Sequence, residues 1–292
     1  MPPPSATFDA IGTRWQVDTA DDLDPAVLEA VVARTAGYDL IWSRFRDDSL
    51  VHRIGASRHG GAFPLPAEAG PLLALYRDLY ECTDGAMSPL VGQTLADWGY
   101  DSAYSLRRAR FISPVPRWED AIAWDGTTLT TAGPVVLDIG AAGKGQLVDL
   151  VAAVLEEHGV TGYTIDASGD ILHHAASALS VALEHPRDST KAIGVATLAS
   201  GALCASASNR RSWPTAGGTV HHILDATTGA PTTAVIATWA TAATTMVADA
   251  MATALFFADP DRLAGSFEFE WALMRADGSV RVSTGFDGRM FP

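Results

Sequence analysis

The residues best suited to chemistry lie near the carboxyl end of the chain, in the segments HHILDATTGAP (residues 221–231) and VADAMATALFF (residues 247–257). In the first segment, His222 lies on the same face of an expected strand as Leu224, and Asp225 ends that strand. A histidine beside a carboxylate can act as a general acid or base near neutral pH. The alternative is a surface histidine, or one held by ordinary hydrogen bonds, beside the Thr228-Gly229 turn.

The second segment predicts a helix with an apolar stripe, because its larger apolar residues recur at helical spacing. Asp249 and Thr253 are four residues apart and project together from another face of that helix. A carboxylate and a hydroxyl at this spacing offer two hard oxygen ligands, which Mg²⁺ prefers. The alternative is a solvated helix face, although it would carry no Lys, Arg or Glu.

A glycine-rich segment, LDIGAAGKGQ (residues 137–146), predicts a turn between a strand that ends at Asp138 and a helix that begins near Gln146. Glycines let backbone N–H groups approach a ligand, while the helix N-terminus and Lys144 add positive charge. The segment is therefore either an anion cradle or a tight turn with an exposed lysine. It is not a Walker A loop, because Asp138 and Gly145 occupy positions where that motif needs Gly and Ser or Thr. The segment TIDASGDIL (residues 164–172) predicts a hairpin turn.

The composition indicates a globular protein with an acidic surface. The chain has 292 residues, of which 48% are hydrophobic, and this is enough to bury a sizeable core. The net charge of −14 disfavours nucleic acid as a partner. An anionic ligand would also be repelled, so its site needs a local lysine, metal ion or helix N-terminus.

Targeting and cysteine patterns point to an ordinary intracellular protein. The first residues show no signal peptide and no lipid-anchor cysteine, so we expect a cytoplasmic location. The stretch from Val235 to Ala258 is nearly uncharged but rich in Ala and Thr and contains Asp249, so it predicts a strand and a buried helix rather than a membrane span. Cys82 and Cys204 are expected to be two buried thiols rather than a disulfide.

The order of the expected elements favours an α+β fold over a doubly wound parallel sheet, since strands and helices do not alternate strictly. The expected helices are Pro25–Thr35, Pro71–Thr83, Gln146–His158 and Thr245–Phe257. The expected strands are Thr13–Val17, Val135–Ile139, Thr161–Ile165, Ile171–His174, Leu179–Leu183, Gly194–Thr197 and Ala234–Ala240. The residues from Arg107 to Leu129 predict a loop-rich connection. No domain boundary is evident, so we expect one domain over residues 1–292, or two intimately packed subdomains.

The motifs together resemble the ApbE family, the FAD:protein FMN transferases. The resemblance runs from Ile11 to Phe257 and is most specific in the DIGAAGKG and HILD-x-x-TG segments. The matching segments, in chain order, are AIGTRW, SRFRDDSLVHRI, TDGAMSPLVGQTLADWGYD, DIGAAGKG, DASGDI, HHILDATTG and VADAMATAL.

The resemblance implies a mixed α+β fold with a mostly antiparallel sheet, an ApbE-like and T-fold-related architecture, and FAD bound in a cleft. It implies Mg²⁺-dependent transfer of the FMN moiety of FAD to a Thr or Ser hydroxyl of an acceptor protein, with release of AMP. The partners would be FAD and that acceptor, and the protein a monomer or homodimer. The implied FAD contacts are Ile11, Phe45, Ala86, Met87, Ser88, Asp138, Lys144 and Ile223.

The resemblance also implies a metal site and a catalytic residue. The side chains of Asp249 and Thr253 and the backbone carbonyl of Ala141 would hold the metal, and His222 would be required for transfer. We expect His222 to orient or deprotonate the acceptor hydroxyl, with Asp225 fixing its tautomer.

The sequence departs from the family pattern at several positions. Ser88 replaces an Asp, Gly55 an Asn, Ala226 a Pro and Ala207 a Gly. None of these positions belongs to the metal pair, the lysine or His222. Two alternatives to the transferase therefore stay open: a Mg²⁺-dependent FAD pyrophosphatase, with water as nucleophile, and a non-catalytic FAD carrier.

Overall fold

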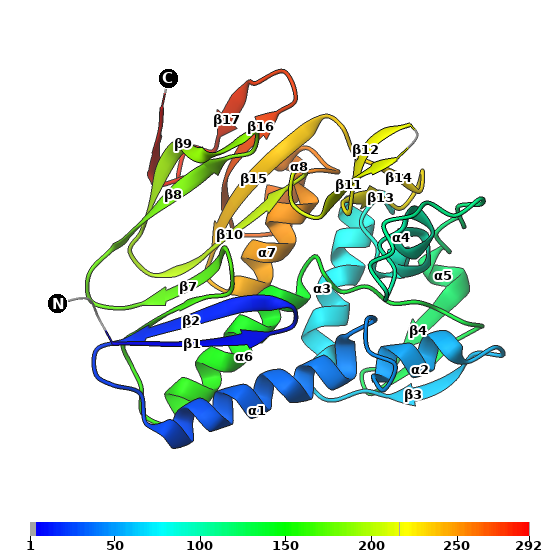
Figure 1. Ribbon diagram of the computed structural model, residues 1–292, viewed down its shortest axis with the longest axis horizontal. Helices are drawn as coiled ribbons and strands as arrows, with labels where there is room; N and C mark the ends of the chain where they lie inside the picture. Colours follow the sequence, from blue (N-terminus) through cyan, green and yellow to red (C-terminus); the bar gives the residue numbers. More distant parts are fainter. Residues whose placement is uncertain (1–3, 216, 292) are drawn as a thin grey trace.

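The computed structural model describes residues 4–215 and 217–291, and its central element is an antiparallel sheet of eight strands (Figure 1). Every neighbouring pair in this sheet is antiparallel. In spatial order the strands are β1 (Ser5–Ala10), β2 (Thr13–Thr19), β6 (Tyr163–Asp166), β7 (Asp170–His174), β10 (Gly201–Ala207), β15 (Val235–Ala242), β16 (Glu270–Arg275) and β17 (Val280–Val282).

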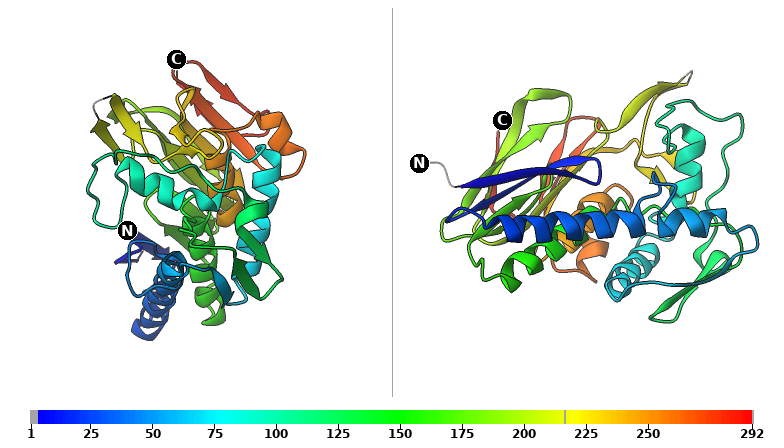
Figure 2. Two further views of the ribbon diagram at one scale, coloured as in Figure 1. Left: turned by 90° about the vertical axis from the view of Figure 1, so that its right-hand side faces the viewer. Right: turned by 60° about the horizontal axis from the view of Figure 1, so that its bottom comes forward.

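Three helices cover one face of the sheet, and a smaller sheet covers the other (Figure 2). The helices are α1 (Pro25–Trp42), α6 (Gly143–Glu157) and α7 (Thr245–Ala254). The smaller sheet has the order β18 (Gly288–Met290), β9 (Asp188–Leu198) and β8 (Leu179–His185). Successive strand residues point to opposite faces. Leu172 and Ala240 accordingly join the core beneath the helices, whereas their neighbours Ile171 and Trp239 join the core beneath the small sheet.

The remaining elements form a cap at one end of the helical layer. They include α2 (Leu50–Ala56), α3 (Ala69–Cys82), the 3₁₀ turn η1 (Pro89–Val91), α4 (Gly92–Trp98), α5 (Trp118–Ala121), α8 (Pro260–Ala264) and the sheet β3 (Gly61–Pro64), β5 (Thr128–Thr131) and β4 (Ile122–Trp124). Two hairpins, β11 (Ser212–Thr215) with β12 (Gly218–His221) and β13 (Leu224–Asp225) with β14 (Ala230–Pro231), face this cap. Indole groups fasten them to α4: Trp213 Nε1 donates to the carbonyl of Trp98, and Trp98 Nε1 donates to the carbonyl of Gly229.

The α+β fold with a mostly antiparallel sheet is confirmed, as are the four expected helices. The helix expected from Gln146 begins earlier, at Gly143, so Lys144 belongs to its first turn. The expected thiols are free: Cys204 is buried and Cys82 half-buried. Among the described residues, no helix is long and apolar enough to cross a membrane. A single domain over residues 1–292 stays a prediction.

The expected strand Val135–Ile139 is wrong, although the other expected strands are present. Val135, Leu137 and Ile139 are buried, but the segment packs against η1 and α4 instead of pairing with a strand. The N–H of Asp138 donates to the carbonyl of Pro89, and a Cβ added at Gly92 would lie 2.4 Å from the carbonyl oxygen of Val136. An apolar run predicts burial, and it does not determine the hydrogen-bond partner.

Helices α6 and α7 pack closely against each other beside the glycine-rich loop. Asp149 of α6 accepts hydrogen bonds from the N–H groups of Thr245 and Met246, which begin α7. Gly145 lies against the same turn: an added Cβ would be 2.3 Å from the carbonyl oxygen of Thr245 and 2.8 Å from Cβ of Asp249. The absence of a side chain at residue 145 therefore lets the two helices approach.

The variant Gly145→Ala is expected to lose about 2 kcal/mol or more of unfolding free energy, because the clash is with backbone and outweighs the gain in helix propensity. Urea unfolding measures the change. Gly70→Ala is the matched control, since Gly70 lies in α3 with no atom within 4 Å of the added methyl group. Equal stability of Gly145→Ala and wild type would contradict the close contact.

Candidate active-site cavity

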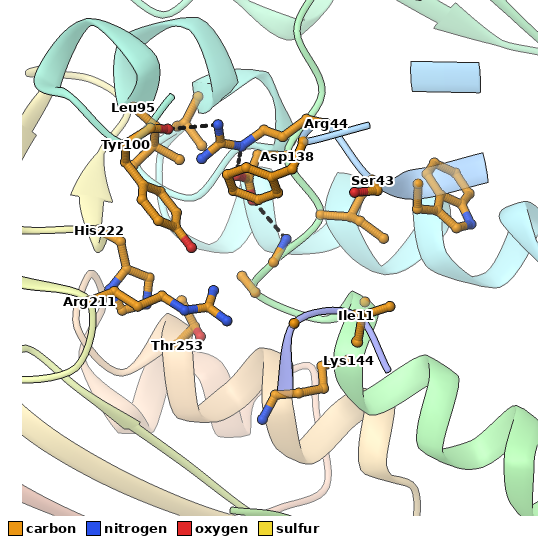
Figure 3. Close-up of a pocket in the computed structure, with 18 of the residues that line it drawn as sticks. Ile11, Ser43, Arg44, Leu95, Tyr100, Asp138, Lys144, Arg211, His222 and Thr253 are labelled. Atoms are coloured by element: carbon orange, nitrogen blue, oxygen red, sulfur yellow. Dashed lines mark hydrogen bonds and ion pairs between the residues drawn. The ribbon is translucent and has the colours of Figure 1, made fainter. Parts of the chain in front are cut away.

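A cavity of about 370 Å³ lies where the ends of α1, α6 and α7 meet the cap (Figure 3). Most of the residues expected at the site line it, although they come from segments far apart in the sequence. These are Ile11, Phe45, Met87, Ser88, Asp138, Ala141, Lys144, His222, Ile223 and Thr253. Ala86 and Asp249 are buried behind the wall instead.

Asp138 at the start of the glycine-rich loop is fixed by Arg44. The Nε of Arg44 donates to Asp138 Oδ2 at 2.5 Å, and the N–H of Gly140 donates to Oδ1 at 2.8 Å. Burial opposes ionisation, but the charge of Arg44 and these hydrogen bonds hold the pKa of Asp138 below its usual value. Arg44 also donates to the carbonyl of Tyr100. Asp138 therefore stays ionised and holds the loop against the cap.

Lys144 lies in a buried acidic cluster. Its Nζ is 2.7 Å from Oδ2 of Asp170, a side chain with 1% exposure, and it also donates to the carbonyl of Ala167. Asp249 accepts a hydrogen bond from the N–H of Gly145 at 2.9 Å. Burial and the charge of Asp170 raise the pKa of Asp249 to about 8, despite the opposing charge of Lys144. One lysine thus faces two buried carboxyl groups, and the cluster favours a further cation.

Thr253 and Ala141 complete the oxygen groups near this cluster. Thr253 Oγ1 lies 3.1 Å from Ser206 Oγ and lines the cavity one turn of α7 after Asp249. Ala141 also lines the cavity, and its N–H donates to the hydroxyl of Tyr76. The solvated-face interpretation of α7 is wrong, because Asp249 is only 4% exposed. In the described part of the chain no group of three His, Cys, Asp or Glu side chains forms a ready metal centre, so a metal here would depend on hydroxyl and carbonyl ligands.

His222 follows β12 directly and is half-buried in the cavity wall. Its Nδ1 has no hydrogen-bond partner among the described residues. Burial first, and then the charge of Arg211, lower its pKa to about 3, so the ring is neutral. The expected pair with Asp225 is not formed, because the Asp225 carboxylate accepts from the N–H and hydroxyl of Thr227 within the turn. His222 instead lies edge-on to Tyr100, with ring centroids 6.3 Å apart.

The sequence interpretation missed several lining residues, of which Arg211 is the most informative. It lies in the turn between β10 and β11 with φ +44°, and its guanidinium points toward the cavity beside His222 and Thr253 (Figure 3). Arg44 and Lys144 each pair with an aspartate, whereas no described carboxylate forms an ion pair with Arg211. The adjacent Arg210 points away and pairs with Glu184. Nothing in the residue pattern distinguishes the two arginines.

Aromatic rings form the wall opposite the charged cluster. Phe45 stacks on Tyr104 with ring centroids 5.0 Å apart and meets Tyr100 edge-on at 5.3 Å. The guanidinium carbon of Arg44 lies 4.2 Å from the centroid of Phe45. The cavity therefore combines an apolar, aromatic wall with a charged floor.

A sequence model described as the ApbE family matches residues 11–270. The chain belongs to the ApbE family. Two curated relatives, both named FAD:protein FMN transferase, are 26% identical to it over 296 residues in Rhodobacter capsulatus and 27% identical over 258 residues in Treponema pallidum. The alignments cover 96% and 79% of this chain, and 55% and 71% of the relatives. The chain thus spans about half the length of the Rhodobacter relative.

Solved ApbE structures have the same fold. The ApbE protein of Thermotoga maritima matches with a TM-score of 0.83 at 22% identity, covering 97% of this chain and 98% of that one. The flavin transferase ApbE of Vibrio cholerae matches with a TM-score of 0.78 at 18% identity, covering 97% of each chain. The ApbE-like architecture expected from the sequence is therefore confirmed.

The variant Lys144→Met is expected to destabilise the protein by about 3 kcal/mol, because it leaves the Asp170 carboxylate buried without a cation. Replacing Asp170 as well, in Lys144→Met/Asp170→Asn, should recover at least about half of that loss. Denaturant unfolding measures both. The control is Lys191→Met, since the Lys191 side chain is 70% exposed and pairs with Asp188 at the surface. A loss no larger than that of the control would contradict the buried pair.

His222 is expected to make stability fall as the pH is lowered. The unfolded chain takes up a proton at His222 below a pKa of about 6.5, whereas the folded protein does not until about pH 3. Between pH 7 and pH 5 this difference amounts to about 2 kcal/mol. The variant His222→Phe should lose that dependence, while the exposed control His59→Gln should keep it. Parallel stability curves for wild type and His222→Phe would show that His222 is not buried in its neutral form.

Proposed function

We propose that this protein transfers the FMN moiety of FAD to a Ser or Thr hydroxyl of an acceptor protein, releases AMP, and uses Mg²⁺. The observation that carries the proposal is the single cavity in which an aromatic wall, Lys144, Thr253 and a neutral His222 converge. The membership in the ApbE family and the names of the curated relatives support the same reaction.

The aromatic wall suits a flavin. Phe45, Tyr100 and Tyr104 offer ring faces and edges, and Met87 and Ile11 add apolar surface. A large planar ring system buries its faces best against such side chains. The isoalloxazine ring would therefore lie toward the cap, and the pyrophosphate toward the glycine-rich loop.

The charged floor suits a pyrophosphate. Helix α6 begins at Gly143, so its N-terminus offers partial positive charge beside the cavity, and Lys144 in its first turn adds a full charge. Arg211 lies beside His222 at the cavity and has no described carboxylate partner. These groups offset the repulsion that a chain of net charge −14 exerts on FAD.

The oxygen groups of α7 fit a magnesium ion. Asp249, Thr253 and the carbonyl of Ala141 are hard oxygen donors, and the buried carboxyl groups of Asp170 and Asp249 exceed the single charge of Lys144. Burial and the charge of Asp170 raise the pKa of Asp249, and a bound cation would favour its ionised form. When bound, Mg²⁺ would neutralise phosphate charge and supply electrostatic stabilisation to the transfer.

The reaction is a displacement at phosphorus. The acceptor oxygen forms a bond to the phosphorus of FMN, the bond from that phosphorus to the bridging oxygen breaks, and AMP leaves with that oxygen. His222 accepts the proton of the attacking hydroxyl, which then passes to solvent. Nδ1 of His222 has no hydrogen-bond partner among the described residues, which leaves its lone pair unused. A neighbouring phosphate would raise the low pKa of His222 and make the ring a better base.

Incubation with FAD, Mg²⁺ and candidate acceptor peptides should give covalent flavin fluorescence on denaturing gels. His222→Ala should bind FAD with unchanged affinity yet label at least about a hundredfold more slowly, as is typical for loss of a general base. Asp249→Asn should lose labelling through loss of the metal.

Free FMN and AMP without labelling would instead indicate a pyrophosphatase, and a stoichiometric flavin complex without turnover would indicate a carrier. Normal labelling by His222→Ala would refute the role of the histidine.

Arg211→Met should weaken the binding of FAD by about tenfold or more and leave the binding of riboflavin unchanged, because only FAD carries phosphate charge. Quenching of flavin fluorescence measures both affinities. Arg210→Met is the matched control: it removes the same charge from the neighbouring residue, whose partner is Glu184. Equal FAD affinities of the two variants would contradict a phosphate contact by Arg211.

A further inference from the structure

The loop that follows α4 carries an exposed basic and apolar surface at the rim of the cavity. We call residues 101–111 the basic loop. It contains three arginines, Arg107, Arg108 and Arg110, and a single acidic residue, Asp101, in a chain whose net charge is −14. In Figure 1 the loop lies at the right-hand end of the molecule, beside α4. Its charge is thus opposite in sign to that of the protein as a whole.

The arginines of the basic loop have no carboxylate partner within the described structure. None of them forms an ion pair with a carboxylate of residues 4–215 or 217–291. Arg108 lies over the ring of Trp98, with 4.9 Å between its guanidinium carbon and the ring centroid. The carboxylate of Asp101 is occupied within the loop, where it accepts hydrogen bonds from Ala103 and Ser105. The positive charge is therefore available to a partner.

Apolar side chains accompany the arginines. Tyr104, Leu106 and Phe111 are 53%, 43% and 70% exposed, and they are three of the largest exposed apolar groups among the described residues. Exposed apolar groups mixed with arginine are typical of a protein interface, whose core favours aromatic residues and arginine. Tyr104 also lines the cavity, so this surface continues directly to the site of the proposed transfer.

The backbone of the basic loop is held in place by hydrogen bonds and by close contacts with α4. The N–H of Leu106 donates to the carbonyl of Gly99, and the N–H of Ala109 donates to the carbonyl of Asp97. Gly99 has φ +109°, and an added Cβ would lie 2.5 Å from the nitrogen of Arg107. Tyr104 and Leu106 also have positive φ, a conformation that costs about 1 kcal/mol or more per residue and persists where surrounding contacts impose it. A surface fixed in advance binds a partner at a lower entropic cost.

We propose that the basic loop docks an acidic segment of the acceptor polypeptide and brings its hydroxyl group to the cavity. This proposal rests on the proposed flavin transfer for its biological role. Charge complementarity identifies the occupant: the rest of the chain repels a polyanion, and only opposite charge within about 8 Å acts strongly at physiological salt. A chain of net charge −14 disfavours an anionic membrane or nucleic acid, whose extended surface would also meet the acidic remainder.

The test is a binding measurement without FAD. Fluorescence anisotropy compares a labelled acidic peptide, EEDGTGDEE, with its neutral counterpart, QQNGTGNQQ. The wild type should bind the acidic peptide at least about tenfold more tightly, and this preference should weaken as NaCl is raised from 50 to 300 mM. The variant Arg107→Gln/Arg108→Gln/Arg110→Gln should lose the preference and keep its FAD affinity, since none of these residues lines the cavity.

The matched control is Arg275→Gln/Arg281→Gln/Arg289→Gln, which removes the same charge from exposed positions on β16, β17 and β18. It should bind the acidic peptide as the wild type does. Equal loss in the two triple variants would overturn the proposal, as would binding of the wild type to vesicles of phosphatidylcholine and phosphatidylglycerol with no preference for the acidic peptide. Because the assay contains no FAD, its outcome is separate from that of the labelling assay, so the two proposals can fail independently.

Discussion

The contact of Lys144 with the buried carboxylate of Asp170 organises the site and the elements around it. The ion pair joins the first turn of α6 to strand β7, and the next residue, Gly145, donates its N–H to Asp249 of α7. Three elements of the helical and sheet layers thus meet through two consecutive residues. A buried carboxylate without its cation is strongly unfavourable, so this junction also fixes where the glycine-rich loop must lie.

The same junction explains how an acidic protein can hold a dianionic ligand. Lys144 lies on the floor of the cavity, where it offsets the charge of Asp170, and Arg211 lies at the edge with no described carboxylate partner. Asp249 and Thr253 would be available to a metal. Arg44 belongs to the structure of the loop, since its charge is used by Asp138. Local geometry therefore matters more than net charge, because charges in a partly buried cavity are screened less than those on the surface. The basic loop is a second place, outside the cavity, where local charge differs in sign from the net charge of the protein.

The sequence predicted those elements in which the spacing of apolar residues indicates which face is buried. The helices were evident from apolar spacing. Helices α6 and α7 bring Lys144 and Thr253 to the cavity, whereas Asp249 is buried behind its wall. Most of the residues that the ApbE motifs pointed to line the cavity, including Phe45 and Ile223, although their roles stay predictions.

What the sequence did not predict depends on contacts between distant segments. Asp170 was visible in the DASGDI turn, but its pairing with Lys144 requires β7 and α6 to be neighbours. Asp225 seemed a partner for His222 because it is near in sequence, yet a turn uses its carboxylate. Arg210 and Arg211 are indistinguishable as letters, and only the turn with positive φ directs one to the cavity and the other to Glu184.

We propose that the oxygen groups of α7 hold a cation that helps to bind the phosphates of FAD. The most direct measurement is the affinity for FAD, by quenching of flavin fluorescence, with and without Mg²⁺, in wild type and Asp249→Asn. The asparagine keeps an oxygen that can accept the N–H of Gly145 but removes the charge. Mg²⁺ should tighten FAD binding by about tenfold or more in the wild type and leave the variant unchanged. Equal tightening in both proteins would contradict the account.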